Sequence, residues 1–176
     1  MAPRGSATRP TSDRVKEALF SILGPPVPRT GTPFRVLDLF AGSGALGLEA
    51  VSRGADEVVL VDEDEAAVAA AGRNVGDLGL ALCVRVIRSE VGRLLQGRGP
   101  AIGIFDWIFV DPPYVGGALD RALRLLSAST VIAPGGWVIA EHARHSEPAD
   151  RIGRLVRDNC RSWGDTAMSF YRIAEE

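Results

Sequence analysis

Short apolar runs alternate with helix-like segments along most of the chain, and this alternation constrains the fold more than any other feature. Strands that alternate with helices form βαβ units around a parallel, doubly wound sheet. The runs are apolar along nearly their whole length, as expected where both faces of a sheet are covered. The predicted class is therefore α/β. We expect strands at residues 34–39, 58–61, 81–87, 105–110 and 136–140, and helices at 44–53, 63–75, 91–95 and 117–127.

The two ends of the chain depart from this alternation. Residues 1–10 have the composition of an arm, and Ser12 is suited to cap a helix whose apolar residues recur with a helical period up to Leu23. Near the other end, residues 155–161 and 167–173 flank a short polar turn, which predicts an antiparallel hairpin at a sheet edge. We expect one domain over residues 1–176, with the basic arm and helix at 1–33 and the α/β core at 34–176.

The charge balance limits the partners of the protein. Basic and acidic residues number 20 and 22, giving a net charge of −2, which argues against binding nucleic acid through positive charge over the whole surface. The first 35 residues nevertheless hold six basic and two acidic side chains, a local charge of +4. Nineteen of the 20 basic residues are Arg, which reflects either codon bias or the preference of phosphates for guanidinium groups. Candidate RNA contacts are Arg4, Arg9, Arg14 and Lys16.

The remaining composition points to a cytoplasmic protein. Cys83 and Cys160 have no partner at metal-binding spacing, so the sequence suggests neither a metal site nor a disulfide framework. Cys83 lies in an apolar run and is expected in the core. His142 and His145 have no catalytic partner at a recognisable spacing, and we expect both in loops or at the surface. We expect neither a membrane span nor a secretory signal.

A glycine-rich loop follows the first predicted strand. Residues 42–47 satisfy G-x-G-x-x-G, and Asp62 follows Gly42 by 20 residues, the spacing of a dinucleotide fingerprint. Glycines allow the backbone to turn tightly and to approach a ligand closely. By itself the pattern suits NAD or another adenosine cofactor. The candidate loop residues are Phe40, Ala41, Gly42, Ser43 and Gly44.

A carboxylate just before the loop favours one of these cofactors. Asp38 stands four residues before Gly42, where it would repel a pyrophosphate but could receive an ammonium group, directly or through water. The glycines also come three residues after the strand instead of directly at its end. Both features favour S-adenosylmethionine, which carries an amino acid end, a sulfonium and no phosphate, and which leaves as S-adenosylhomocysteine.

Two later strand ends supply candidates for the rest of the cofactor. Asp62 ends the second predicted strand, where it can accept hydrogen bonds from both ribose hydroxyls. Residues 63–65 are all acidic, which suits a helix N-terminus; Glu63 also stays a cofactor candidate. Ser89 and Glu90 follow the third strand and could reach the adenine amine, although Glu90 also suits a solvated loop.

The segment Asp111-Pro112-Pro113-Tyr114 follows the fourth predicted strand. Two prolines fix the backbone and remove two N–H donors, which leaves carbonyl groups and the Asp111 carboxylate as a cluster of acceptors. Acceptors on the hydrogens of a planar amine would orient it and stabilise the charge that grows during methyl transfer. Tyr114 offers an aromatic face on which a base can stack. The candidate catalytic residues are therefore Asp111, Pro112 and Tyr114.

Four segments together resemble the RsmD family of bacterial S-adenosylmethionine-dependent methyltransferases. They are residues 9–20, beginning Arg-Pro-Thr-Ser-Asp-Arg, residues 37–47, residues 111–114, and the Gly164-Asp165-Thr166 turn. The resemblance implies the class I methyltransferase fold, a Rossmann-like sheet with an antiparallel last strand. It also implies methylation of N2 of one guanine in 16S ribosomal RNA, within an assembled or assembling 30S subunit, by a monomer that needs no metal.

The resemblance also assigns residues. Asp38, Gly42 and Gly44 would contact the methionine part of the cofactor, Asp62 its ribose and Glu90 its adenine region. The 111–114 segment would hold the guanine, and Arg9, Thr11 and Arg14 would lie near the cofactor mouth or the RNA backbone. Family members usually begin with a basic β-hairpin, whereas only residues 1–8 precede the Arg-Pro-Thr segment here. We therefore expect a truncated chain, a misplaced start or a different mode of RNA docking.

Three other functions fit parts of the pattern. Methylation of adenine N6 or of a protein glutamine is compatible with Asp-Pro-Pro-Tyr. An NAD-dependent oxidoreductase is compatible with the glycine loop, but a positioned His or a Tyr–Lys pair for hydride transfer is not evident. A noncatalytic ribosome-assembly factor could keep the fold alone.

Overall fold

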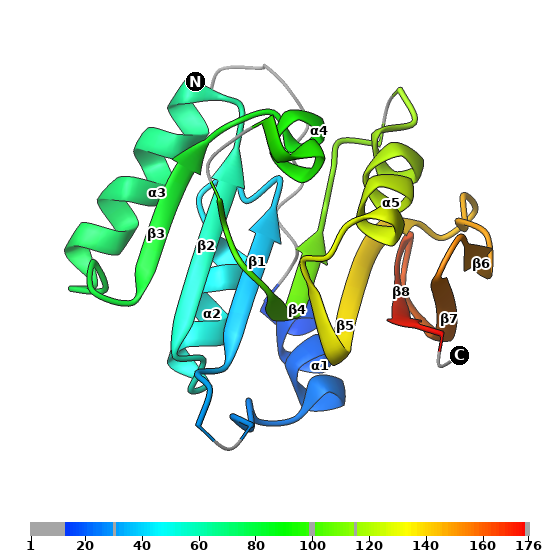
Figure 1. The fold of residues 1–176 in the computed structure, drawn as a ribbon, viewed down its shortest axis with the longest axis horizontal. Coiled ribbons are helices and arrows are strands. Elements are labelled where there is room, and N and C mark those ends of the chain that lie inside the picture. The colour runs from blue at the N-terminus through cyan, green and yellow to red at the C-terminus, as the bar shows by residue number, and fades with distance from the viewer. Residues whose placement is uncertain (1–12, 30, 99–100, 115, 175–176) are drawn as a thin grey trace.

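The computed structural model describes residues 13–29, 31–98, 101–114 and 116–174. They build one eight-stranded sheet with the strand order β3-β2-β1-β4-β5-β8-β7-β6 (Figure 1). The strands are β1 (Arg35–Leu39), β2 (Glu57–Asp62), β3 (Val84–Arg88), β4 (Phe105–Val110), β5 (Ile132–Ala143), β6 (Arg151–Ile152), β7 (Leu155–Trp163) and β8 (Thr166–Ile173). The helices are α1 (Asp13–Leu23), α2 (Ala45–Ser52), α3 (Glu65–Asp77), α4 (Val91–Arg93), the π-helical turn η1 (Leu94–Arg98) and α5 (Ala118–Ala128).

The sheet is doubly wound, as the alternation predicts. Strands β1 to β5 pair in parallel. Side chains alternate between two apolar layers along each strand: Val36 packs in the layer that contains α1, α2 and α3, and Leu37 in the layer of α4, η1 and α5. Figure 1 shows α4 and α5 on the viewer's side of the sheet. The architecture is the class I methyltransferase fold, with antiparallel strands at its C-terminal end.

Helix α1 covers the middle of the sheet through one apolar face. Leu19 and Phe20 are fully buried, and the Phe20 ring lies 6.1 Å from that of Trp107 and 5.8 Å from that of Phe109. Gly24 adopts a φ of 72° and donates its N–H to the carbonyl of Phe20, which ends the helix where the sequence predicts.

Most predicted elements lie within a few residues of their expected bounds, and the differences arise from local hydrogen bonding. Strand β3 begins at Val84 and not at 81, because the N–H groups of Cys83 and Val84 both bond to the carbonyl of Leu80 and close a turn. Strand β5 is longer than expected and pairs irregularly with β4 between Phe105 and Trp107. The short strand β6 was not predicted. Cys83 is half-buried and packs against the core.

The predicted C-terminal hairpin is confirmed. Strands β7 and β8 pair antiparallel around a turn in which Gly164 adopts a φ of 61°. Strand β8 also pairs antiparallel with β5, so the last strand of the sequence lies between β5 and β7. This placement brings the turn at 164–166 to the end of β5.

One histidine was predicted wrongly. His145 is exposed in a turn, as expected, but His142 belongs to β5 and is only 2% exposed. Its Nε2 lies 2.9 Å from Ser169 Oγ and its Nδ1 2.9 Å from the carbonyl oxygen of Ala143. Ser169 could not be predicted as a partner, because only the β5–β8 pairing brings it beside His142.

Candidate active site

The glycine loop leaves β1 through an unusual backbone. Phe40 adopts a φ of 64°, a left-handed conformation that a bulky residue rarely adopts and that costs about 1 kcal/mol or more. Gly42 and Gly44 have φ values of 56° and 87°. A Cβ at Gly42 would have nothing within 4 Å, whereas one at Gly44 would lie 2.7 Å from Leu60 Cδ1. The loop therefore needs glycine for its backbone at both positions and for close packing at Gly44.

Asp38 lies beneath this loop, in the interior. Its side chain is 2% exposed, and its Oδ2 accepts a hydrogen bond of 2.9 Å from the N–H of Gly47 in α2. Burial raises the pKa of Asp38 to about 7, the Gly47 N–H opposes this shift, and the nearby Asp62 carboxylate adds to it. A buried carboxyl group with one backbone donor is suited to bind a cationic ligand, whose positive charge would balance the negative charge of the carboxylate.

Asp62 links the loop to the end of β2 by hydrogen bonding. Its Oδ2 accepts from the N–H of Gly42 at 2.8 Å and its Oδ1 from the N–H of Asp64 at 2.9 Å. Each carboxylate oxygen keeps a second lone pair, so Asp62 can shape the loop and still accept bonds from a ligand. Asp64 in turn caps α3 by accepting from the N–H of Ala67. Glu63 is exposed, outside the helix.

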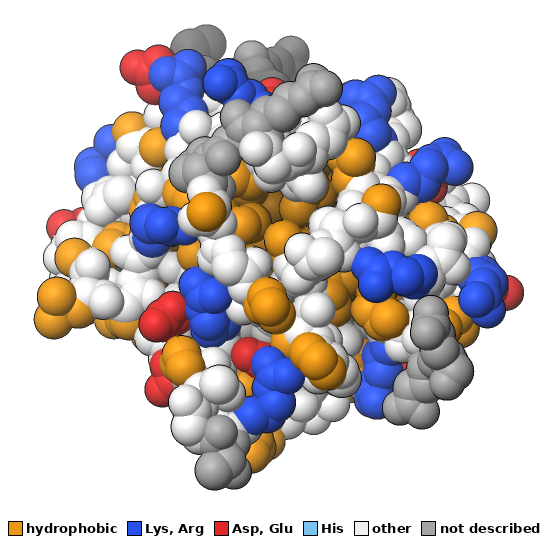
Figure 2. Space-filling view, in the orientation of Figure 1, with side chains coloured by type: hydrophobic (Ala, Val, Ile, Leu, Met, Phe, Trp, Pro, Cys, Tyr) orange, Lys and Arg blue, Asp and Glu red, His pale blue; other side chains and the backbone are white. Residues whose placement is uncertain are grey.

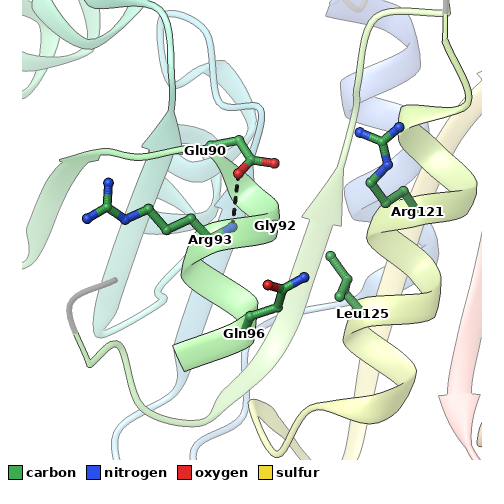
Figure 3. Close-up of a pocket in the computed structure, with 6 residues that line it drawn as sticks. All are labelled: Glu90, Gly92, Arg93, Gln96, Arg121 and Leu125. Atoms are coloured by element: carbon green, nitrogen blue, oxygen red, sulfur yellow. Dashed lines mark hydrogen bonds between the residues drawn. The ribbon is translucent and has the colours of Figure 1, made fainter. Parts of the chain in front are cut away.

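Ser89 and Glu90 follow β3, as predicted. Glu90 caps α4 by accepting from the N–H of Arg93 at 3.2 Å. Its carboxylate borders a pocket of about 450 Å³ between α4 and α5 (Figure 3), where Gln96 and Leu125 point into the opening from opposite sides. The lining residues are Glu90, Gly92, Arg93, Gln96, Arg121 and Leu125.

The Asp-Pro-Pro-Tyr segment begins where β4 ends, beside the end of β1. Leu39 and Val110 are register partners, and the backbone N–H of Asp111 lies 3.5 Å from the carbonyl oxygen of Leu39. Pro112 is buried, whereas Tyr114 is 59% exposed. Burial, followed by the negative charges of Glu141 and Asp38, raises the pKa of Asp111 to about 8. Burial and these charges thus favour the protonated form of Asp111.

Sequence reasoning missed Glu141, which lies near the end of β5 and is only 5% exposed. Its Oε1 accepts a hydrogen bond of 3.1 Å from the Tyr114 hydroxyl. Burial and the charge of Glu141 raise the pKa of Tyr114 to about 12. The one available signal was an acidic residue at the end of a strand otherwise apolar from Trp137 to Ala140, as at Asp62.

The strand order brings the predicted residues of the core to one edge of the sheet. Because β3, β2, β1, β4 and β5 are neighbours in that order, their carboxyl ends present a row of polar groups. Along this row lie Glu90, Asp62, Asp38 with the glycine loop, Asp111 and Glu141.

The predicted N-terminal contacts are only partly within the described residues. Arg4, Arg9 and Thr11, with the capping Ser12, lie outside them. Arg14 is exposed on α1, and Lys16 forms an ion pair of 3.2 Å with Asp13. Because α1 packs on the face opposite α4 and α5, these two side chains do not belong to the pocket of Figure 3.

The face that carries α4 and α5 is hollowed and rich in basic groups. Figure 2 shows basic side chains around a hollow with a hydrophobic floor, between α4 and α5. Within the described ranges, no group of three or more His, Cys, Asp or Glu side chains is arranged to hold a metal ion. None of the described helices is long and apolar enough to cross a membrane.

Comparison with known proteins places the chain in a family. The family described as conserved hypothetical protein 95 matches residues 1–172. A Bacillus subtilis protein named "Putative rRNA methyltransferase YlbH" is 36% identical over 171 residues, covering 97% of this chain and 91% of that protein. The Escherichia coli protein named "Ribosomal RNA small subunit methyltransferase D" is 37% identical over 139 residues, or 79% of this chain and 63% of that protein.

Solved structures agree on the fold. A structure titled "Putative methyltransferase yhhF" from Escherichia coli has a TM-score of 0.81 and 29% identity, and the match covers 97% of this chain and 90% of that one. An RNA methyltransferase from Salinibacter ruber, solved with S-adenosyl-L-homocysteine, has a TM-score of 0.68 over 95% of both chains. At 19% identity, the second likeness concerns the fold alone.

Proposed function

The chain belongs to the RsmD family, and from this premise we propose that it methylates ribosomal RNA with S-adenosylmethionine as the donor. The finer assignment is the exocyclic N2 amine of a guanine in 16S RNA. The substrate is RNA within an assembled or assembling 30S subunit, and the enzyme acts in the cytoplasm as a monomer. Relatives named as rRNA methyltransferases support the RNA substrate; the guanine rests on the resemblance described above.

The residues along the strand ends fit the proposed cofactor. Asp38 offers a buried carboxylate for the ammonium group, Gly42 leaves open space beside the backbone, and Asp62 has free lone pairs for ribose hydroxyls. Ser89 and Glu90 lie at the adenine end of this row, beside the pocket in Figure 3. Bound there, S-adenosylmethionine supplies an electrophilic methyl group on a sulfonium.

The 111–114 segment would hold the base amine. The Asp111 carboxyl oxygen accepts a hydrogen bond from the amine, orients its lone pair and stabilises the positive charge that develops on nitrogen. Tyr114 presents a ring for stacking, which can contribute ~1–3 kcal/mol. The remaining acceleration comes from holding the two reactants in line.

One observation carries this proposal: the cofactor loop and the acceptor turn leave adjacent strands at the same edge. The Leu39–Val110 pairing fixes the two segments side by side. An arrangement with the acceptor turn on a distant strand would separate donor and amine.

Incubation with methyl-labelled S-adenosylmethionine and unmodified 30S particles tests the function. We expect label in 16S RNA, recovered as N2-methylguanosine after digestion. Label in N6-methyladenosine or in protein would favour the corresponding alternative instead, and no RNA labelling would refute the proposal. Calorimetric titration with NAD and S-adenosylmethionine separates the oxidoreductase: NAD binding alone would overturn the methyltransferase.

Asp111→Ala distinguishes an enzyme from a noncatalytic assembly factor. We expect it to abolish RNA methylation and to leave the Kd for S-adenosylmethionine within about threefold, because Asp111 faces the amine and not the donor. Retained activity would make Asp111 a structural residue only. Asp77→Ala, at the exposed end of α3, is the matched control and keeps full activity.

A further inference from the structure

The Tyr114 side chain is anchored at one end only. Its ring is 59% exposed, but its hydroxyl donates a hydrogen bond of 3.1 Å to the buried Glu141 carboxylate. The Thr166 side chain lies close enough to the same hydroxyl to lower its pKa. Tyr114 therefore presents an exposed ring, while its hydroxyl binds Glu141 of β5 and lies near Thr166 of β8.

The terminal hairpin of β7 and β8 brings Thr166 to the Tyr114 hydroxyl. Thr166 begins β8 and pairs with Ala143 on β5 and with Trp163 on β7. The turn before it is tied to β5, because the N–H of Arg144 donates to the carbonyl of Asp165 at 2.8 Å. The position of the Thr166 hydroxyl is thus set by a turn more than 50 residues beyond Tyr114.

The pairing of β4 with β5 positions Glu141, the acceptor for the Tyr114 hydroxyl. Val110 and Ala140 are register partners, so the residue after each, Asp111 and Glu141, leaves the same end of adjacent strands. Glu141 is 5% exposed. A buried carboxylate seeks donors, and the Tyr114 hydroxyl is one that the structure supplies.

We propose that Glu141 and Thr166 are positioning residues that hold Tyr114 by its hydroxyl, so that the C-terminal Gly164-Asp165-Thr166 turn takes part in base binding. In this arrangement Tyr114 donates to Glu141, and the nearby Thr166 hydroxyl is placed to donate to the Tyr114 oxygen. This inference rests on the proposed function only for the identity of the group that stacks on the ring.

The physical effect is pre-organisation. An exposed aromatic side chain that moves freely must be ordered when a base stacks on it, and ordering one side chain opposes binding. A ring fixed at its hydroxyl has already lost that freedom during folding. Removing one such hydrogen bond, at 0.5–1.5 kcal/mol, corresponds to a loss of about 2- to 12-fold in kcat/KM for RNA.

A measurement without substrate tests the contact itself. The two tyrosines of the chain, Tyr114 and Tyr171, are labelled with ¹³C at Cζ, and Tyr114→Phe identifies the Tyr114 resonance. We expect Thr166→Val and Glu141→Gln each to shift the Tyr114 resonance and to leave that of Tyr171 in place. An unmoved Tyr114 resonance in Thr166→Val, in a protein with wild-type Tm, would overturn the proposal.

Kinetics then test the role of the contact. We expect Thr166→Val to lower kcat/KM for 30S particles about 3- to 10-fold without changing KM for S-adenosylmethionine, and Thr166→Ser to restore it. In the Tyr114→Phe background Thr166→Val has no further effect, because the hydroxyl through which it acts is gone. The matched control is Thr130→Val, an exposed threonine in the bend that precedes β5, which keeps wild-type kinetics.

The two experiments distinguish a failure of the positioning role from a failure of the proposed methyltransferase function. An equal loss from Thr166→Val in wild-type and Tyr114→Phe backgrounds would overturn the positioning role. If wild-type protein methylates no RNA, the proposed function fails, and the Cζ resonances alone decide whether Glu141 and Thr166 hold Tyr114.

Discussion

Asp38 shows at the scale of one residue how burial and a bound ammonium group would shift a pKa in opposite directions. Its pKa of about 7, against an ordinary 3.8, means that the folded protein binds this proton more tightly than the unfolded chain. Stability from Asp38 is therefore greatest below about pH 4 and is lost as pH rises toward 7. A bound ammonium group would lower this pKa and offset the loss.

Asp38→Asn should increase the stability of the protein while it weakens the binding of S-adenosylmethionine. We expect the variant to unfold at higher urea concentration at pH 8, because it removes a charge whose burial costs on the order of 4 kcal/mol. The same variant should bind S-adenosylmethionine about 10- to 100-fold more weakly, since a charge-assisted hydrogen bond is lost. Urea titrations at pH 5 and pH 8 and calorimetry measure the two effects. Asp77→Asn serves as the control; weaker binding without the gain in stability would contradict the assignment.

Asp111 gives the reaction a pH dependence of its own. Its pKa of about 8 means that the stronger acceptor, the carboxylate, becomes the main form only in mildly alkaline solution. We expect kcat/KM for RNA to rise with pH and to level off above about 8. In Asp111→Asn the profile should be flat over this range and the rate lower throughout. A rise of the same shape in Asp111→Asn would assign the ionisation to another group.

At the scale of elements, the contact between α2 and β2 sets how closely the cofactor loop approaches the sheet. A Cβ at Gly47 would overlap Leu60 Cδ2 and lie 2.9 Å from Val58 Cγ1. The same glycine supplies the N–H that binds Asp38. The third glycine of the motif therefore serves helix packing and holds the candidate ammonium-binding carboxylate.

Gly47→Ala tests this packing. We expect a loss of about 1–3 kcal/mol in the free energy of unfolding, because α2 must move away from β2. Gly72→Ala is the matched control: it lies within α3, where an added Cβ would meet nothing within 4 Å. It should stabilise the protein by about 0.5–1 kcal/mol. Urea unfolding measures both, and equal effects of the two substitutions would refute the packing argument.

At the scale of the whole molecule, a net charge of −2 coexists with a basic face. Basic side chains surround the hollow between α4 and α5 (Figure 2). Arg121 lines the pocket there and lies one turn into α5, the helix that follows the Asp-Pro-Pro-Tyr segment. A surface of this kind can bind an RNA backbone locally while the rest of the protein repels it.

Arg121→Ala should weaken RNA binding through charge. We expect a higher Kd for 30S particles and a slope of log K against log salt that is smaller by about 1, the effect of one lost phosphate contact. The Kd for S-adenosylmethionine should not change. The control is Arg73→Ala, exposed on α3 on the opposite face. An unchanged salt slope in Arg121→Ala would place the RNA elsewhere.

The sequence by itself determined the class of fold and most of the candidate site, because both depend on local order. Apolar runs and helical periodicity specify βαβ units, and in a parallel sheet every strand ends at the same edge. Asp38, Asp62, Glu90 and Asp111 could thus be found simply as polar residues at or just beyond the ends of strands. Gly42 and Gly44 were found because a tight turn needs their backbone freedom.

Only the tertiary structure decided what depends on contacts between distant segments. The burial of His142, the raised pKa values of Asp38 and Asp111, and the contact of Glu141 with Tyr114 all arise from neighbours far away in the chain. The insertion of β8 between β5 and β7 creates several of these contacts at once. Local patterns place residues at an edge, but the strand order decides which of them meet and how much water remains around each.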